Sequence, residues 1–428
     1  MKAFIANTHS VMNSGDAGIV LAQIRFLRKL CPSLEISLSS RTPRLDKKIY
    51  SDLDVKLLPP LIPAPSVYSG AVEKIRKCLK NLFAIRSKAA FLREIKGSDL
   101  VISSGGGYFW SHRKFLPGPM FLQNYLHLMP AVQRKKPVFF FPQSFDPLRS
   151  RAAVRLLKNL LKEASVVRIY AREQPSFRYL ERILEKTERV RICPDMAFLL
   201  DPPGRSTPEH PHLWSSLKRP VVAMTLRQWD FPETRDARSK TTKRDTYMEN
   251  MREICRSVWK KWDGSVVLFC QSRGPGPFED DRLITGFLAE SLRHRIPAEN
   301  FRFVDLPETA HPHDILDLLS RADLLIATRF HSAIFALITG TPVISIAYQK
   351  KSTGILKALG LERFNIPISD FDAERILGLG REILDHNEEI RSGIRRKVRE
   401  MRERIEDELA STVRPFLSQE SHEDSAGQ

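Results

Sequence analysis

Short β-rich runs alternate with helical patterns along most of this chain, and this alternation restricts the possible folds more than any other feature. The order strand, helix, strand is typical of βαβ units that build a parallel sheet. Two such series occur, which predicts an α/β protein with two doubly wound sheets. The expected strands are Ala3–Ala6, Leu34–Leu38, Val55–Leu58, Leu100–Ser103, Val138–Phe141, Val166–Tyr170 and Val190–Ile192, then Val221–Leu226, Val266–Cys270, Phe301–Val304, Leu324–Ala327 and Val343–Ala347.

The break between the two series is rich in Pro, Gly, Ser and His, a composition typical of linkers. The end of the chain is densely charged and has apolar residues at helical spacing, which predicts helices that close back across both domains. We therefore expect a Rossmann-like domain at 1–200, a linker at 201–220, a second Rossmann-like domain at 221–372, C-terminal helices at 373–418 and a disordered tail at 419–428.

Two charged segments stand apart from this organisation. Asp230 to Asp245 carries many charges and no strand or helix period, and it follows a strand. We interpret it either as a mobile loop that closes over a substrate or as a solvated surface insertion. Lys74 to Lys96 interleaves basic and apolar residues at helical spacing. It is either a surface helix that packs on a sheet or a helix that lies on an anionic membrane.

The formal net charge of +18 indicates anionic partners. The basic residues are scattered, and the sequence contains no zinc-finger spacing and no RNA-recognition motif, so we expect no nucleic-acid partner. It contains no signal-peptide pattern and no uninterrupted apolar span, and its five cysteines form no C-x-x-C pair. We expect a cytoplasmic protein, with peripheral contact to the inner face of an anionic plasma membrane as one interpretation.

Glycine and polar residues follow several of the expected strands, at the edge where open α/β sheets bind ligands. Asn13-Ser14-Gly15-Asp16 separates the first strand from the first helix, and Asp16 is either a helix cap or a functional carboxylate. Ser104-Gly105-Gly106-Gly107 follows a strand, which favours close approach of the backbone to a ligand or to the other domain. Pro142-Gln143-Ser144 follows another strand.

The strongest cluster lies in the second half of the chain. Arg227 follows one strand, and Arg329-Phe330-His331 follows another and opens a helix. Two guanidinium groups beside a helix N-terminus favour a compact anion with several negative charges. A structural ion pair is the alternative for either arginine.

These motifs, in this order, resemble the polysaccharide pyruvyl transferase family over roughly Asn7 to Leu359. The resemblance rests on Asn13-Ser14-Gly15-Asp16, Asp99-Leu100-Val101-Ile102-Ser103-Ser104-Gly105-Gly106-Gly107, Pro142-Gln143-Ser144, Ala171-Arg172-Glu173 with Ser176, Pro194-Asp195-Met196-Ala197-Phe198, Leu226-Arg227, Thr328-Arg329-Phe330-His331-Ser332, Gly340-Thr341-Pro342-Val343-Ile344, Tyr348 and Lys350. It implies a GT-B-like fold, in which two Rossmann-like domains face each other across a cleft.

The resemblance also implies an activity: transfer of a pyruvyl group from phosphoenolpyruvate to hydroxyls of a cell-surface polysaccharide precursor, with formation of a ketal. Phosphoenolpyruvate is then a co-substrate, the acceptor is a glycan or lipid-linked glycan, and no cofactor or metal is expected. By resemblance His331 is the catalytic residue and the donor contacts are Arg227, Arg329 and Phe330. The residues assigned to the acceptor or the cleft are Asn13, Gly15, Asp16, Gly105, Gly106, Gly107, Gln143, Ser144 and Arg172.

Two other functions stay open at this point. A GT-B glycosyltransferase would need a carboxylate for the ribose of a nucleotide sugar, for which Glu308 and Asp314 are the available residues. A basic, non-catalytic protein that binds a glycan or a membrane is the other alternative. The sequence predicts neither the acceptor sugar nor the oligomeric state.

Overall fold

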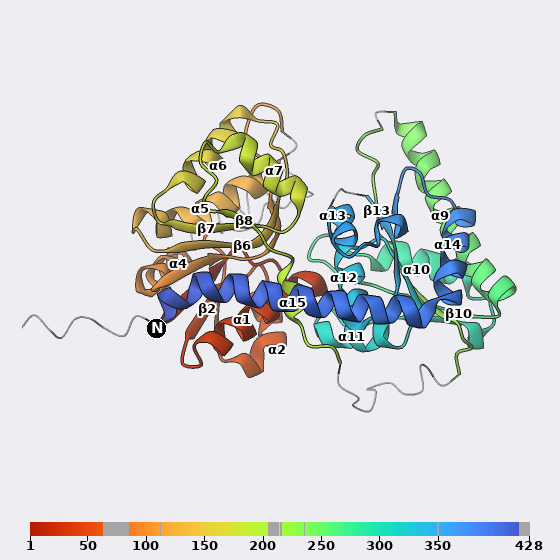
Figure 1. The fold of residues 1–428 in the computed structure, drawn as a ribbon. Coiled ribbons are helices and arrows are strands. Elements are labelled where there is room, and N and C mark those ends of the chain that lie inside the picture. The colour runs from red at the N-terminus through yellow and green to blue at the C-terminus, as the bar shows by residue number, and fades with distance from the viewer. Residues whose placement is uncertain are drawn as a thin grey trace, which may run out of the picture. The chain divides into compact units, whose positions relative to one another are not determined.

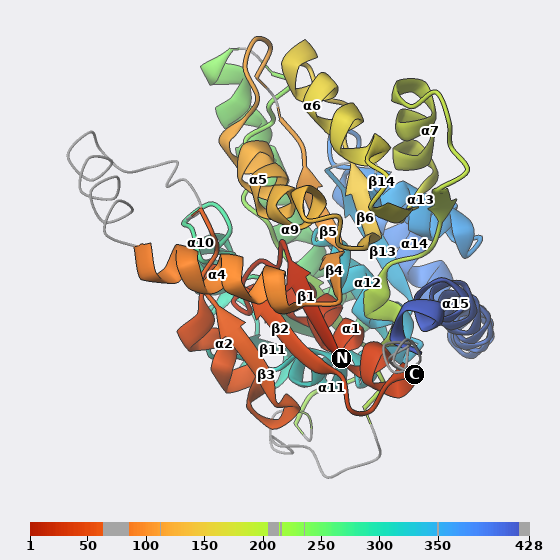
Figure 2. The same ribbon diagram turned by 90° about the vertical axis from the view of Figure 1, so that its left-hand side faces the viewer.

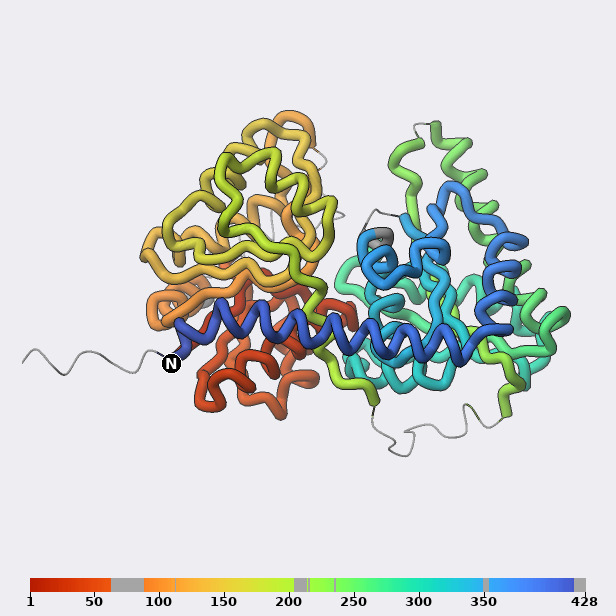
Figure 3. The backbone as a smooth tube through the Cα atoms, in the orientation of Figure 1, coloured from red at the N-terminus to blue at the C-terminus, as the bar shows by residue number. Residues whose placement is uncertain are grey.

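A computed structural model describes residues 1–62, 85–111, 113–203, 214, 216–234, 236–348 and 351–418. The chain forms two compact units, and in Figure 3 it can be followed by colour from the first into the second. The first unit holds Met1–Val11, Gly18–Leu199 and the chain from Met401, and the second holds Met12–Ala17 and Leu200–Glu400. The predicted boundary near residue 200 thus misses one feature, because the short segment Met12–Ala17 lies with the second unit.

The first unit is built on a parallel sheet with the strand order β3-β2-β1-β4-β6-β7-β8, and β5 pairs with β6 (Figure 2). Its central strands are buried along their whole length, as expected for a parallel sheet that is covered on both faces. The strands are β1 (Lys2–Ala6), β2 (Glu35–Ser39), β3 (Val55–Leu58), β4 (Leu100–Ser103), β5 (Gly106–Phe109), β6 (Val138–Phe145), β7 (Val166–Ala171) and β8 (Val190–Ile192).

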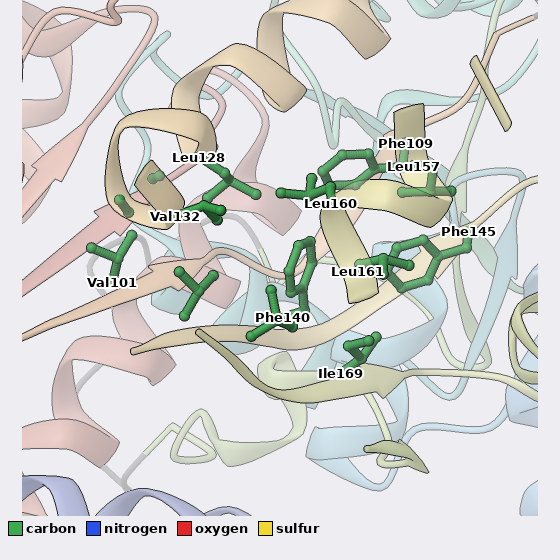
Figure 4. Close-up of a cluster of buried hydrophobic side chains, with 14 of the residues drawn as sticks. Val101, Phe109, Leu128, Val132, Phe140, Phe145, Leu157, Leu160, Leu161 and Ile169 are labelled. Atoms are coloured by element: carbon green, nitrogen blue, oxygen red, sulfur yellow. The ribbon is translucent and has the colours of Figure 1, made fainter. Parts of the chain in front are cut away.

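Amphipathic helices cover this sheet. In α6 leucines and alanine recur at helical spacing and point inward, while arginines and lysines occupy the other face. Figure 4 shows this side of the core, where Leu157, Leu160 and Leu161 lie with Phe140 and Phe145 of β6. The helices are α1 (Ser14–Leu30), α2 (Pro43–Tyr50), α4 (Ile85–Gly97), α5 (Pro119–Gln133), α6 (Arg151–Lys162) and α7 (Gln174–Ile183).

The second unit repeats the design with a parallel sheet of order β11-β10-β9-β12-β13-β14. The strands are β9 (Val221–Thr225), β10 (Ser265–Phe269), β11 (Phe301–Val304), β12 (Leu324–Ala327), β13 (Val343–Ala347) and β14 (Asn365–Pro367). The helices are α9 (Ala237–Trp262), α10 (Arg282–Leu292), α11 (Pro312–Ser320), α12 (Phe330–Thr339), α13 (Lys351–Ala358), α14 (Ala373–Asp385) and α15 (Asn387–Leu417), whose last part belongs to the first unit (Figure 1). The predicted α/β class is confirmed.

Each sheet has a point at which the strand order reverses. In the first sheet this switch point lies between β1 and β4, and in the second it lies between β9 and β12. In open α/β sheets ligands bind beyond the carboxyl ends of the strands at this position. The loops that follow β9 and β12 are therefore the first place to look for a site in the second unit.

Three local predictions were wrong. Pro142-Gln143-Ser144 does not follow a strand but lies inside β6, and Gly106 and Gly107 begin β5, which the sequence did not predict. The segment 230–245 is not irregular throughout, because α9 begins at Ala237 and its N-cap Asp236 accepts a hydrogen bond from the backbone N–H of Ser239. The tail 419–428, Lys350, most of the linker and residues 74–84 of the basic segment lie outside the described residues, and the rest of that segment lies in α4.

Candidate active site

Arg227 and Arg329 lie on opposite sides of the switch point of the second sheet. Arg227 comes two residues after the end of β9, and Arg329 is the N-cap residue of α12, two residues after the end of β12. Because β9 and β12 are paired neighbours, both arginines lie at one edge of the sheet. The predicted position of Arg329, at a strand end and a helix start, is confirmed.

Arg329 forms a buried ion pair with Asp281, so the structural alternative considered for the arginines applies to it, although the sequence did not identify the partner. Its Nε donates hydrogen bonds to both carboxylate oxygens of Asp281, at 3.0 and 2.9 Å, and its Nη2 donates to the carbonyl oxygen of Glu279 at 3.2 Å. Burial lowers the pKa of Arg329, but the charge of Asp281 more than offsets it, so the pKa lies above its usual value. The guanidinium therefore stays charged and fixed in direction.

Arg227 has aromatic neighbours in place of a carboxylate. Its Nη1 donates a hydrogen bond to the hydroxyl of Tyr348, and its guanidinium carbon lies 4.2 Å from the centre of the Tyr348 ring. The ring of Trp229 lies 5.7 Å from the same carbon. Among the described residues the Nε of Arg227 has no hydrogen-bond partner. Burial and the nearby charge of Arg329 lower the pKa of Arg227, which therefore gains from an anionic ligand.

A buried tyrosine holds the two loops of the switch point together. The hydroxyl of Tyr247 accepts a hydrogen bond from the backbone N–H of Arg227 at 3.4 Å and lies 3.2 Å from the hydroxyl oxygen of Thr328. The Thr328 hydroxyl in turn donates to the carbonyl oxygen of Thr225 at 3.0 Å. Burial raises the pKa of Tyr247 to about 12, so the phenol keeps its proton.

His331 lies in the first turn of α12, against Gly15. A Cβ atom on Gly15 would lie 2.3 Å from both Cγ and Nδ1 of the imidazole, so only glycine leaves room for the ring. The ring of Phe330 meets the imidazole edge to face, with the ring centres 5.1 Å apart. His331 is half-buried, and Phe330 is buried.

The segment Met12–Ala17 reaches His331 because it packs on the loop that follows β10. The backbone N–H of Ser14 donates to the carbonyl oxygen of Gln271 at 3.2 Å, and the hydroxyl of Ser332 donates to Oε1 of Gln271 at 3.0 Å. Asn13 pairs with Ser272 in an isolated β-bridge. The structure thus brings Asn13, Gly15 and the histidine together within the second unit.

Asn13, and not Asp16, caps the first helix. The Oδ1 of Asn13 accepts a hydrogen bond from the backbone N–H of Gly15 at 3.1 Å. Asp16 is buried in the first turn of α1, where a carboxylate is favourable for the helix dipole.

Arg273 adds a third positive charge, fully buried under this segment. It donates to the carbonyl oxygen of Cys270 at 2.8 Å and to the hydroxyl of Ser14 at 2.6 Å. Burial lowers its pKa. Three arginines lie here with two buried carboxylates, Asp281 and Asp16, so together with the N-terminal ends of α1 and α12 the region keeps a positive balance. Chemically it suits a small dianion or trianion beside an imidazole.

In the first unit, Ser144 and Arg172 belong to a buried polar network. Arg172 donates to the hydroxyl of Ser144 at 2.7 Å and to a carboxylate oxygen of Asp195 at 2.6 Å, and Ser144 donates to Glu173 at 2.9 Å. All four side chains are buried. The network connects β6 with the loop after β7 and satisfies its own charges, so its members hold the sheet edge in shape.

Gly105, Gly106 and Gln143 are also buried, whereas Gly107 is half-buried. A Cβ on Gly105 would lie 2.8 Å from the carbonyl oxygen of Pro142, so this position needs a glycine for backbone packing against β6. Gly106 has φ of 125°, a conformation that favours glycine, and lies under the ring of Tyr108. The Nε2 of Gln143 lies 3.5 Å from the Ser103 hydroxyl.

The sequence missed the partly exposed side chains at this same edge. Arg41, after β2, hydrogen-bonds the Nε2 of His9, after β1, and the His9 ring is stacked parallel to Tyr108 with 5.9 Å between ring centres. Arg41 and Tyr108 are half-buried. The only sequence signal for them is their place after strands at the switch point of the first sheet.

Neither a cluster of metal-binding side chains nor a helix that could cross a membrane occurs among the described residues. No group of three or more His, Cys, Asp or Glu side chains there has the arrangement of a metal site. No helix in the described part of the chain is long and apolar enough to cross a membrane.

Comparison of the sequence with known proteins identifies a family that the chain matches. Residues 13–350 match the sequence model of the family described as polysaccharide pyruvyl transferase. The chain is 25% identical to the amylovoran biosynthesis protein AmsJ of Erwinia amylovora, over 94% of this chain and 96% of that protein.

Solved structures share the fold at low sequence identity. A UDP-GlcNAc 2-epimerase from Neisseria meningitidis, bound to UDP-GlcNAc, matches with a TM-score of 0.60 and 12% identity over 96% of this chain and 99% of that chain. The HepE protein of Anabaena, in complex with UDP and glucose, matches with a TM-score of 0.55 and 12% identity over the same shares of the two chains. These neighbours have the GT-B-like architecture, which confirms the predicted fold.

Proposed function

Because the chain belongs to the polysaccharide pyruvyl transferase family, we propose that it transfers a pyruvyl group from phosphoenolpyruvate to two hydroxyls of a polysaccharide precursor and forms a ketal. The family and the amylovoran relative support a role in polysaccharide synthesis. The observation that carries the proposal is the placement of Arg227 and Arg329 on the two sides of the switch point, with His331 in the first turn of α12.

The donor is the trianion for which this region is suited. Phosphoenolpyruvate carries a phosphate and a carboxylate, and arginine binds both groups through paired N–H donors. Asp281 and the carbonyl oxygen of Glu279 occupy Nε and Nη2 of Arg329, so Arg329 offers the hydrogens of Nη1. Arg227, which has no carboxylate partner among the described residues, is the stronger donor contact and binds with the hydroxyl of Tyr348 beside it.

His331 supplies the proton that starts the reaction. Its imidazolium protonates the methylene carbon of phosphoenolpyruvate, and the first sugar hydroxyl adds to C2, which has become electron-poor. The second hydroxyl then displaces phosphate from C2 and closes the ring. One hydroxyl proton returns to the imidazole and the other leaves with phosphate, so atoms and charges balance. A positioned general acid of this kind contributes roughly 10²–10⁴-fold to the rate.

The acceptor contacts are assigned to half-buried side chains at the switch point of the first sheet. Ser144, Arg172 and Gln143 are buried and hold the edge in shape. Tyr108 and Arg41 are half-buried at the same edge, and an aromatic ring with a guanidinium is a combination that binds sugar hydroxyls and C–H faces.

The two carboxylates available to the nucleotide-sugar alternative, Asp314 and Glu308, both have partners within the structure. Asp314 accepts a hydrogen bond from the backbone N–H of His311 at 2.7 Å in the capping box of α11. Glu308 pairs with Arg282 at 3.3 Å. Both groups are therefore engaged in roles that hold the fold.

The test measures phosphate release from phosphoenolpyruvate in the presence of oligosaccharide fractions from the producing cells. Wild-type protein should release phosphate only with a competent acceptor, and in deuterated water the ketal methyl should gain one deuterium, because the proton comes from a solvent-exchangeable imidazole. His331→Ala should lose roughly 10²-fold or more in rate. His294→Ala, which removes an exposed histidine, is the matched control and should keep full activity. Turnover of a nucleotide sugar without use of phosphoenolpyruvate would refute the proposal.

A further inference from the structure

The loop between β5 and α5 exposes two large apolar side chains next to each other. Phe115 is 88% exposed and Leu116 is 65% exposed, more than the other large apolar side chains of the described residues except Leu283. Neighbouring apolar side chains that remain in water at a loop tip indicate an interaction surface. In the first unit, this loop leads directly into the N-terminal end of α5.

Hydrogen bonds hold the backbone of this loop in its exposed position. The hydroxyl of Ser150, the N-cap of α6, donates to the carbonyl oxygen of Phe115 at 3.0 Å. The Ser111 hydroxyl accepts from the backbone N–H of Gly118 at 2.9 Å and of Arg113 at 3.4 Å. The fold therefore presents Phe115 outward, and a local collapse of the loop would break these bonds.

Positive charge surrounds the two apolar side chains. Arg113 and Lys114 precede them and are exposed, and Arg149 and Arg151, also exposed, flank the Ser150 that holds Phe115. None of these four cations forms an ion pair with a carboxylate of the described residues. The sequence from residue 100 to 162 contains ten basic residues and a single acidic one, Asp146.

We propose that this surface, made of Arg113, Lys114, Phe115 and Leu116 with Arg149 and Arg151, docks on an anionic lipid bilayer. Phe115 and Leu116 enter the interfacial layer, and the four cations bind lipid phosphates. The charge favours a lipid bilayer as the partner, because an apolar loop tip close to four unpaired cations matches the interface of an anionic bilayer. A stable protein interface would need about 800 Å² of complementary surface on each side, more than a two-residue tip provides.

The test uses the full chain and sedimentation with vesicles of phosphatidylcholine alone or mixed equally with phosphatidylglycerol. Wild-type protein should bind the mixed vesicles, and less at high salt. Phe115→Ser with Leu116→Ser should greatly reduce this binding. The matched control is Leu283→Ser with Phe287→Ser, which removes an equally exposed apolar pair from α10 and should bind like wild type.

A second pair of variants tests the charges. Arg113→Gln with Lys114→Gln should weaken binding roughly 30-fold, since each basic residue near an anionic surface contributes about fivefold. Lys47→Gln with Lys48→Gln, two exposed lysines on α2, should have a much smaller effect. Equal thermal unfolding midpoints show that the variants fold.

Three results would overturn the proposal. The first is that the variant with Phe115→Ser and Leu116→Ser binds vesicles as well as wild type does. The second is that the α10 control loses as much binding as this variant. The third is that the wild-type protein does not bind vesicles but self-associates through Phe115.

Discussion

Gly15 lies so close to His331 that a methyl group on the glycine would fall 2.3 Å from the imidazole. Gly15→Ala must therefore push the ring out of its position. A misplacement of about 1 Å at a reacting group can reduce a rate roughly 10²-fold, and we expect a loss of that size in kcat. Steady-state phosphate release measures it.

The control for Gly15→Ala is Gly378→Ala in α14, where a new Cβ would meet nothing within 4 Å. This variant should keep its activity and gain up to about 1 kcal/mol of stability, because alanine favours a helix. Full activity of Gly15→Ala would show that the position of His331 does not matter for turnover.

Asp281→Ala should strongly reduce the free energy of unfolding. It leaves the guanidinium of Arg329 buried without its carboxylate, and removal of one partner of such a pair costs about 3–5 kcal/mol. Urea unfolding followed by circular dichroism measures the change. Asp317→Ala breaks the more exposed pair of Asp317 and Arg321 on α11 and should cost about 1 kcal/mol or less.

Arg227→Lys should weaken the binding of phosphoenolpyruvate, because a point charge replaces the planar fork. Arg329→Lys should do the same and should also destabilise the fold, because lysine cannot form the bidentate pair with Asp281. Calorimetric titration with phosphoenolpyruvate separates the two effects. Normal affinity in both variants would remove the two arginines from the donor site.

Tyr247→Phe should reduce the affinity for phosphoenolpyruvate indirectly, because Tyr247 holds the loop of Arg227 and does not itself bind the donor. It removes the hydroxyl that connects the backbone of Arg227 with Thr328, at a cost of about 1 kcal/mol in stability. Tyr179→Phe removes a comparable hydroxyl, which accepts from the backbone N–H of Leu148 at 3.2 Å in the first unit. That control should lose similar stability and keep its affinity; equal losses of affinity in both would contradict the role of Tyr247.

Stability should fall in mild acid because of His127. Its Nδ1 donates to the side-chain oxygen of Asn7 at 3.1 Å and its Nε2 accepts from the backbone N–H of Ile62 at 3.3 Å, so the fold holds a neutral ring. Burial lowers its pKa from 6.5 to about 4. The unfolded chain therefore binds a proton that the folded chain rejects between these two values. Stability present above pH 6.5 should decline by about 1.4 kcal/mol per pH unit down to about pH 4.

The matched measurement compares urea unfolding of wild type and His127→Gln at pH 7.5 and pH 5. Glutamine carries no titratable group, so the variant should be less stable at pH 7.5 but should lose less stability on acidification. An identical pH dependence of both proteins would show that His127 is not responsible.

The sequence predicted all strands except β5 and β14, because most of them are short runs rich in Val, Ile, Leu and Phe with turn residues around them. The prediction failed where the same type of residue occurs in two kinds of local structure. Gly106 and Gly107 look like a loop, yet they begin β5, in which Gly106 pairs with Gln143 of β6 and lies against the ring of Tyr108. Charged residues at the start of α9 show no apolar period, yet they continue the exposed first turns of a helix whose later turns are buried.

The site was predicted in part, for a related reason. Arg227, Arg329 and His331 follow recognisable strands, so their positions could be inferred. Asp281 could not be chosen among four consecutive charged residues, because which one points inward depends on the loop after β10. Predicted acceptor residues such as Ser144 and Arg172 proved buried, because polar residues at a strand end can equally well satisfy one another.

The short segment Met12–Ala17 belongs to the second unit, although its neighbours on both sides in the chain belong to the first. This segment is therefore encoded in the first half of the gene but belongs to the second unit of the structure. A chimera that exchanges the two halves of related enzymes at residue 200 would bring a foreign glycine to the histidine. Recombination that keeps the surroundings of His331 intact would have to carry these six codons with the second half of the gene.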